Sequence, residues 1–356
     1  PPDPHFLDLC DTMGFAVIDE AFDAWTEGKI VNDYSSLFSE WSERDLTDMI
    51  LRDRNHCSVI MWSIGNEINE QGHPDGWKVA AALADICHKT DPSRPVTAGL
   101  DRPDAAIPND FPPALDIIGW NYKPHRYPEF HEKYPQIPQF GSETASTISS
   151  RGEYFFPVEA GPEWHHHENI QCSSYDLEFP PWASTPDREF EMQDACPWIF
   201  GEFVWTGFDY LGEPTPYNAH WPAHASYFGI FDLVGLPKDR AWLYAARWSG
   251  KPVLHLLPHW TWPGREGQNT PVHVYTNYNS VELFVNGISA GIRTRSGSKF
   301  RLTWDNVTHA PGELSAVARD ASGKELARET IRTASAPVRL ALSADRTTLS
   351  ADGEDL

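Results

Sequence analysis

The first 248 residues alternate short apolar runs with longer amphipathic stretches. Residues 43–54 place Leu46, Met49 and Ile50 on one helical face, and residues 76–89 show the same spacing. Strands are predicted where short apolar runs occur, at residues 15–18, 58–64, 96–100, 115–122, 137–141 and 198–206. Strands that alternate with helices are typical of parallel βαβ units.

This pattern predicts an α/β barrel of the TIM type over residues 1–248. A TIM barrel closes with eight strands. The pattern supplies six strands, so we expect an incomplete barrel whose first two strands lie before Pro1. Residues 144–197 are rich in Pro, Ser and Glu and exceed ordinary loop length, which predicts a functional loop over a cleft. A loop without a function is the alternative.

A different pattern begins at about residue 251, where short runs alternate apolar and polar positions. Asn286-Gly287 directly follows one such run and is a strong hairpin signal. We therefore predict an immunoglobulin-like β-sandwich over residues 251–335. Residues 338–342 read as another strand, so residues 336–356 are expected to begin a further β-domain.

The composition limits the classes of partner that the protein can bind. The formal net charge of −23 disfavours nucleic acid and anionic membranes, because both bind cationic surfaces. No apolar run reaches the roughly 20 residues of a membrane span. The 15 Trp, 12 Tyr and 18 Phe suit stacking on sugar rings, although a large core uses aromatic residues too.

The five cysteines are odd in number and show no C-x-x-C spacing, so they predict neither a disulfide framework nor a zinc site. Adjacent histidines at positions 165–167 cannot easily face one ion, and no metal or other cofactor is expected. The chain starts without Met and ends soon after a strand-like run, so we expect it to be part of a longer protein. The sequence leaves the compartment of the protein open, with a periplasmic or extracellular location favoured. It also leaves open whether the protein forms a homo-oligomer.

Two segments carry the candidate chemistry. Residues 62–67 and 138–143 are mostly apolar runs that end in Gly, one small polar residue and a glutamate, Glu67 or Glu143. In a βα barrel the reacting groups sit where the strands end. A single carboxylate at a strand end is most often just solvated, but two of them in the same context predict one shared cleft.

Paired carboxylates are what hydrolysis of a glycosidic bond needs. In the retaining mechanism one carboxylate attacks the anomeric carbon, and the other first protonates the leaving oxygen and then activates water. The two carboxyl groups then lie about 5–5.5 Å apart. A nearby ionised carboxylate also raises the pKa of the acid, which that role requires.

Residues 52–67, 138–143 and 201–214 resemble three segments of glycoside hydrolase family 2, in its β-galactosidase branch. The resemblance implies a barrel preceded by β-domains and followed by an immunoglobulin-like domain. It implies that Glu67 is the acid/base and Glu143 the nucleophile. It also implies that Tyr122 hydrogen-bonds the nucleophile and that Trp205 stacks on the sugar.

This sequence departs from the family pattern at two points. Cys57 stands where the family usually has proline. A histidine-bearing segment of the family's barrel would precede Pro1, so part of the sugar pocket lies outside this chain.

Single residues indicate which sugar the protein binds. Asn66 could hydrogen-bond a sugar hydroxyl, and so could Asp19 and Glu20 at the end of the first strand, where a structural salt bridge is the equal alternative. The lysine that β-glucuronidases carry before a Gly-Ile-Phe element is absent before residues 229–231, which favours a neutral sugar. Asp209 and Glu213 either line the cleft or solvate a turn.

The sequence therefore predicts a retaining exo-β-galactosidase that acts on a carbohydrate substrate. The alternatives are a β-glucuronidase or β-mannosidase of the same family, and a non-catalytic carbohydrate-binding protein built on a hydrolase barrel.

Overall fold

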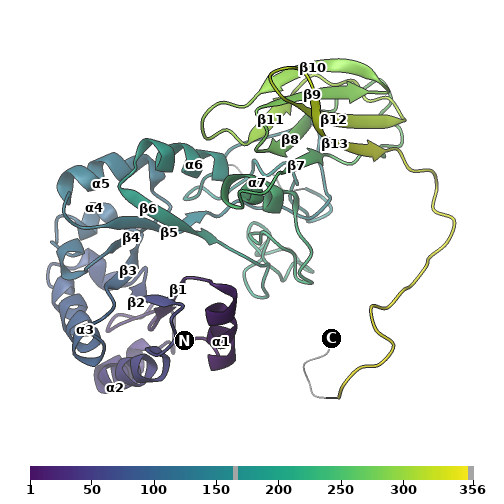
Figure 1. The fold of residues 1–356 in the computed structure, drawn as a ribbon. Helices are drawn as coiled ribbons and strands as arrows, with labels where there is room; N and C mark the ends of the chain where they lie inside the picture. The colour runs from purple at the N-terminus through teal and green to yellow at the C-terminus, as the bar shows by residue number, and fades with distance from the viewer. Residues whose placement is uncertain (163–166, 352–356) are drawn as a thin grey trace.

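The computed structural model describes residues 1–162 and 167–351. Its first part is a curved, six-stranded parallel sheet in the order β1-β2-β3-β4-β5-β6. Helices lie along the outer side of this sheet (Figure 1). The arrangement is that of a TIM-type half-barrel and confirms the predicted fold class. The strands are β1 Val17–Glu20, β2 Val59–Asn66, β3 Val96–Leu100, β4 Ile118–Asn121, β5 Gln139–Ala145 and β6 Ile199–Trp205.

The helices differ from prediction mainly at their starts. Helix α2 spans Ser35–Asp53 and begins eight residues before the predicted start, because Asp33 accepts hydrogen bonds from the Ser35 amide and hydroxyl. Phe38 adds a buried side chain to its first turns. The other helices of this part are α1 Pro4–Met13, α3 Gly76–Thr90, α4 Pro103–Ala106, α5 Tyr127–Lys133, α6 Pro186–Ala195 and α7 Asp239–Trp248, with short 3-10 turns at Asn69–Gly72, Pro112–Ala114 and Pro124–Arg126.

The stretch predicted as one long loop, residues 144–197, contains helix α6. This helix has Pro186 in its first turn and buries Glu189 and Phe190. Its sequence is polar overall, so apolar periodicity did not reveal it. The described residues between β5 and α6, 146–162 and 167–185, form no further helix or strand.

The second part is an all-β sandwich of a four-stranded sheet, β10-β9-β12-β13, and a three-stranded sheet, β11-β8-β7, as expected for an immunoglobulin-like domain. Asn286 and Gly287 form the hairpin between β9 and β10, both with positive φ, as predicted. The strands are β7 Leu254–Leu257, β8 Val272–Thr276, β9 Ser280–Val285, β10 Ile288–Thr294, β11 Arg301–Trp304, β12 Glu313–Arg319 and β13 Glu325–Arg332.

Residues 333–351 carry neither helix nor strand and run away from the sandwich (Figure 1). The strand expected at residues 338–342 is absent from this part of the structure, and its leucines are almost fully exposed. An isolated strand without a partner has nowhere to place its backbone hydrogen bonds. The domain boundaries proposed from the sequence remain predictions.

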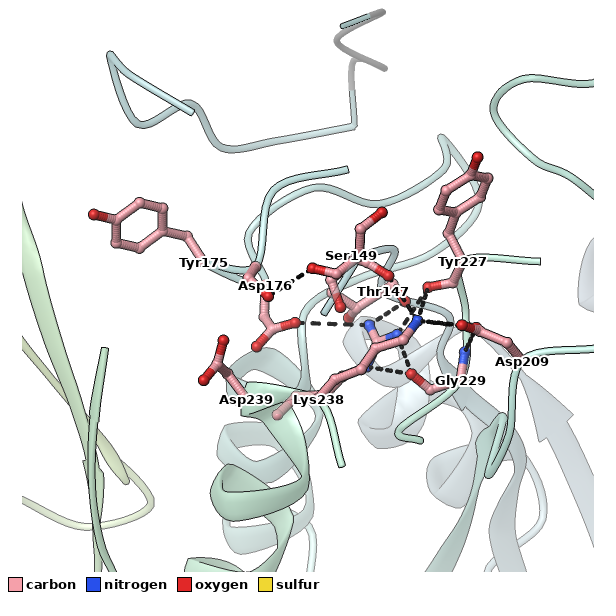
Figure 2. A network of polar contacts seen from close by, with 12 residues as sticks. Thr147, Ser149, Tyr175, Asp176, Asp209, Tyr227, Gly229, Lys238 and Asp239 are labelled. Atoms are coloured by element: carbon pink, nitrogen blue, oxygen red, sulfur yellow. Dashed lines mark hydrogen bonds and ion pairs between the residues drawn. The ribbon is translucent and has the colours of Figure 1, made fainter. Parts of the chain in front are cut away.

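A buried polar network ties the loops after β5 and β6 to helix α7 (Figure 2). Lys238 Nζ donates to Ser149 O at 2.6 Å and forms an ion pair with Asp209 at 2.8 Å. Arg240 donates to the carbonyl oxygens of Thr147, Tyr227 and Gly229. Both cationic side chains are about 1 % exposed. The network therefore fixes two long loops that follow neighbouring strands.

Asp176 shows how strongly this network constrains the fold. Its carboxylate is fully buried and lies 3.9 Å from Arg240 Nη1. Burial raises its pKa, and the Arg240 charge opposes that rise. Because an unpaired buried charge is costly, Asp176 depends on the guanidinium beside it.

We predict that Arg240→Met lowers the free energy of unfolding by about 3–5 kcal/mol, because it takes the adjacent guanidinium from the buried Asp176 and removes hydrogen bonds to three loop carbonyls. Urea unfolding of the intact protein measures this loss. The control is Arg44→Met, which removes an exposed i,i+4 pair with Asp48 and should cost less than about 0.5 kcal/mol. Equal effects of the two substitutions would contradict the network's structural role.

Candidate active site

The carboxyl ends of four strands converge on one cavity. Glu67 directly follows β2, Tyr122 directly follows β4, Glu143 lies in β5 and Trp205 ends β6. All four line a cavity of about 470 Å³. The sequence predicted that these residues share a cleft, and the geometry brings them together. The complete lining is Asp23, Lys29, Asn66, Glu67, Asp101, Tyr122, Lys123, Glu143, Ser146, Trp182, Trp205 and Glu213.

The backbone at two strand ends is locally strained. Glu67 and Tyr122 have φ values of 47° and 56°, in the left-handed region that non-glycine residues rarely adopt. The Glu67 amide donates to Gly99 O, and the Tyr122 amide donates to Glu143 O, both at 2.9 Å. Such conformations cost about 1–3 kcal/mol each and cluster at functional sites. The neighbouring strands thus hold both residues in place.

Asn121 connects Glu67 on one side of the cleft with Ser142, the neighbour of Glu143, on the other. The sequence did not predict this residue as part of the site. Its amide nitrogen donates to Glu67 Oε1 and to Asn66 Oδ1, both at 3.0 Å. Its amide oxygen accepts from Ser142 Oγ at 2.6 Å. The side chain is fully buried, so it orients Glu67 rigidly. Its position directly before Tyr122, at the end of a predicted strand, was the sequence feature that could have identified Asn121 as a site residue.

The two glutamates hold protons more readily than they would in water. Burial, together with the neighbouring charge of Glu67, raises the pKa of Glu143 to about 7. The Tyr122 hydroxyl donates to Glu143 and opposes this rise. Burial also raises the pKa of Glu67, against the hydrogen bond from Asn121. Interacting carboxyls of this kind titrate as a pair, and one proton shared between them gives one acid and one carboxylate.

Asp19 and Glu20 face opposite sides of β1. Glu20 accepts from Ser63 Oγ at 2.6 Å and lines a second cavity of about 280 Å³, which shares Asn66, Glu143 and Trp205 with the first. Asp19 lines neither cavity, and the prediction that it binds sugar is corrected. Its carboxyl is buried next to Asp53 of α2, and burial raises its pKa to about 7. Successive strand residues point to opposite faces, so only one of the two could reach the cavity.

Loop residues complete the cleft, and the sequence did not identify most of them. Lys29 Nζ donates to Asp23 Oδ1 at 2.7 Å and to Asn66 O at 2.8 Å. Glu213, one of the two acids left open by the sequence, lines the cleft and accepts from Tyr210. The other, Asp209, pairs with Lys238 in the buried network instead.

The histidine run gives no metal site in the described structure. His165 and His166 lie outside the described residues, and His167 stacks on Phe155 with ring centroids 3.6 Å apart. Within residues 1–162 and 167–351, a single trio has ligand atoms near one another, namely Asp8, Asp11 and His56. None of these three lines the cleft. In the same described ranges, none of the helices combines the length and apolarity that crossing a bilayer demands.

Comparison with known proteins identifies the family. Residues 1–108 match the model "Glycosyl hydrolases family 2, TIM barrel domain", and residues 267–327 match "Domain of unknown function (DUF4982)". The whole chain aligns at 40% identity with the beta-galactosidase BoGH2A of Bacteroides ovatus. The chain belongs to glycoside hydrolase family 2. It covers 46% of the length of BoGH2A, so less than half of that relative is compared.

Other family 2 relatives support the fold and differ in their named activities. A crystal structure of a beta-glycosidase from Bacteroides vulgatus superposes over the whole chain with a TM-score of 0.83 at 36% identity, and the chain covers 47% of it. A beta-glucuronidase of Bacteroides fragilis is 25% identical over 78% of the chain, which covers 39% of that protein. Membership of family 2 therefore leaves the sugar open.

Gly99 allows the close approach that positions Asn66. A Cβ atom at this site would fall far inside van der Waals distance of Asn66 Oδ1. We predict that Gly99→Ala displaces Asn66, disturbs the Asn121 contact to Glu67 and lowers kcat/KM about 100-fold. The control is Gly201→Ala on β6, where a Cβ atom would meet nothing within 4 Å. Steady-state kinetics of both variants checks this, and unchanged kcat/KM in Gly99→Ala would refute it.

Removing the Tyr122 hydroxyl should shift the pH dependence of the reaction. The hydroxyl stabilises the ionised form of Glu143, so Tyr122→Phe raises the pKa of that carboxyl. We expect the acidic limb of the kcat/KM profile to move to higher pH, with the largest loss of activity on the acidic side. A pH–rate profile measures the shift, and an acidic limb that stays in place would contradict this role for Tyr122.

Proposed function

We propose that the protein is a retaining exo-β-galactosidase, with Glu143 as nucleophile and Glu67 as acid/base. The observation that carries the proposal is the cleft that both glutamates line, with the Tyr122 hydroxyl bonded to one and the Asn121 amide bonded to the other. A hydroxyl donor favours the ionised carboxylate that a nucleophile must be. Burial raises the pKa of Glu67, as the acid requires.

In the first half of the reaction the Glu143 carboxylate attacks the anomeric carbon of the bound sugar. The bond from that carbon to the leaving oxygen breaks, and the Glu67 carboxylic acid gives its proton to this oxygen. The products are a covalent glycosyl ester on Glu143 and a free alcohol. Glu67 is left as a carboxylate.

In the second half that carboxylate takes a proton from water as the water oxygen attacks the same carbon. The ester bond to Glu143 breaks, the nucleophile is restored and the sugar leaves with its original anomeric configuration. Asn66 and Trp205 line the cleft. We infer that Asn66 hydrogen-bonds a sugar hydroxyl and that the indole of Trp205 stacks on the sugar ring.

The charges in the cleft favour a neutral sugar. Among the described residues, five carboxyl groups, including the acid Glu67, and two ammonium groups line the cleft, and the Lys29 ammonium is already engaged by Asp23 and Asn66. A negatively charged sugar would meet this excess of carboxylates. The identity to the beta-galactosidase BoGH2A supports the galactoside assignment.

A β-glucuronidase is the second candidate, because one specific observation favours it. The ammonium of Lys123 lines the cleft near Glu67, where it could meet a carboxylate. Several relatives are named as beta-glucuronidases, and a "Putative beta-glucuronidase" of Formosa agariphila is 32% identical over 96% of the chain, below the 40% of BoGH2A. A β-mannosidase has no such residue in its favour.

The assignment is tested with nitrophenyl glycosides and two glutamate variants. The wild-type protein should cleave the β-galactoside faster than the β-glucuronide or β-mannoside, and NMR should detect β-galactose as the first product. Glu143→Ala should lose at least about 10⁴-fold in kcat. Glu67→Ala should lose about 10²–10⁴-fold, with the smallest loss on substrates whose leaving group needs no proton.

The control is Glu40→Ala, an exposed position on α2, which should leave activity intact. Fastest cleavage of the glucuronide would favour the second candidate. Unchanged turnover in both glutamate variants would exclude the proposed mechanism. Sugar binding without any turnover in the wild-type protein would favour a non-catalytic binding protein.

A further inference from the structure

One lysine in the cleft lacks a hydrogen-bond or ion-pair partner among the residues that the structure describes. Lys123 follows Tyr122 directly, lines the cleft and is half-buried. Among the described residues, no hydrogen bond or ion pair within 4 Å engages its ammonium, whereas Lys29 has two such partners. Burial lowers the pKa of Lys123, so its location works against its charge. A cation held in this way in a cleft is poised to bind a ligand.

The surroundings of Lys123 place it on the leaving-group side. Lys123 and Asp101 both act electrostatically on Glu67. Asp101 lies two residues after Gly99, whose carbonyl accepts from the Glu67 amide, and its carboxylate accepts from Gln71 in the turn that follows Glu67. In the proposed mechanism Glu67 protonates the leaving oxygen, so groups beside Glu67 face the departing group.

We propose that Lys123 and Asp101 determine specificity by binding hydroxyl groups of a leaving-group sugar, so that the substrate is an oligosaccharide. This inference rests on the proposed function and names the substrate class of the same site. It predicts that a glycoside with a small leaving group is a poorer substrate than a disaccharide.

The chemistry of the two side chains fits a neutral sugar. The ammonium offers three donors, and the carboxylate of Asp101 accepts from Gln71 Nε2 at 2.6 Å while keeping further lone pairs. A sugar hydroxyl is both donor and acceptor, so vicinal hydroxyls can bond to both side chains at once. A carboxylate-bearing sugar would gain from Lys123 but would lie beside Asp101 and the other acids of the cleft.

The test compares two substrates in the intact protein. One is the disaccharide β-galactosyl-1,4-glucose, and the other is methyl β-galactoside, whose leaving group also needs the proton of Glu67 but has no ring. We expect Lys123→Met to lower the ratio of their kcat/KM values, disaccharide over methyl galactoside, by about 10–100-fold, the effect of one or two charged hydrogen bonds. Asp101→Asn should lower the same ratio, by less. It serves as the second variant if Lys123→Met fails to fold.

The matched control is Lys78→Met on α3, whose ammonium pairs with Asp75 on the surface. It should leave the ratio unchanged. An unchanged ratio in Lys123→Met, or equal losses on both substrates, would overturn the inference, because Lys123 would then act only through Glu67. Faster cleavage of a disaccharide with a uronate leaving group, lost in Lys123→Met, would also overturn it in favour of a carboxylate ligand.

A failure of the proposed function is visible separately. If wild-type protein leaves galactosyl fluoride intact and hydrolyses glucuronyl fluoride, the galactoside assignment is wrong. The ratio is then measured with the corresponding glucuronides, and its fall in Lys123→Met would still support the role of Lys123.

Discussion

The hydrogen-bond register of the parallel sheet is the constraint on which the site depends. Glu67 and Tyr122 enter the cleft because their amides are held by carbonyls of the next strand, at Gly99 and Glu143. A slip of one residue would turn each strand's side chains to the opposite face. The chemistry of the cleft therefore rests on main-chain bonds between strands, and the side-chain contacts refine a position that the sheet has already set.

Much of this framework could be predicted from the chain. Apolar runs that end in Gly-x-Glu marked the strand ends, and the two glutamates came together as the barrel geometry implies. Asp19 and Glu20 show the limit of such reasoning. Strand alternation dictates that only one of two adjacent residues reaches the cavity, but the run at residues 15–18 is too short to indicate which one.

The remaining features depend on loops and burial, which periodicity does not encode. Trp182 and Asp101 reach the cleft along irregular segments, whose paths are set by tertiary contacts. Lys238 and Arg240 are fully buried, although lysine and arginine are almost never fully buried without partners, so residue type alone does not predict their position. Their partners come from chain segments up to 93 residues away, so no local pattern revealed them.

The anchors of the two long loops have a consequence for how far the sequences of these loops can vary. Arg240 binds main-chain carbonyls, and Lys238 binds two of them in addition to Asp209. A carbonyl group is present whatever side chain its residue carries. The loop residues can therefore be exchanged during evolution while the path of the loop is kept. A single scaffold can in this way acquire new sugar preferences by small steps without first losing its shape.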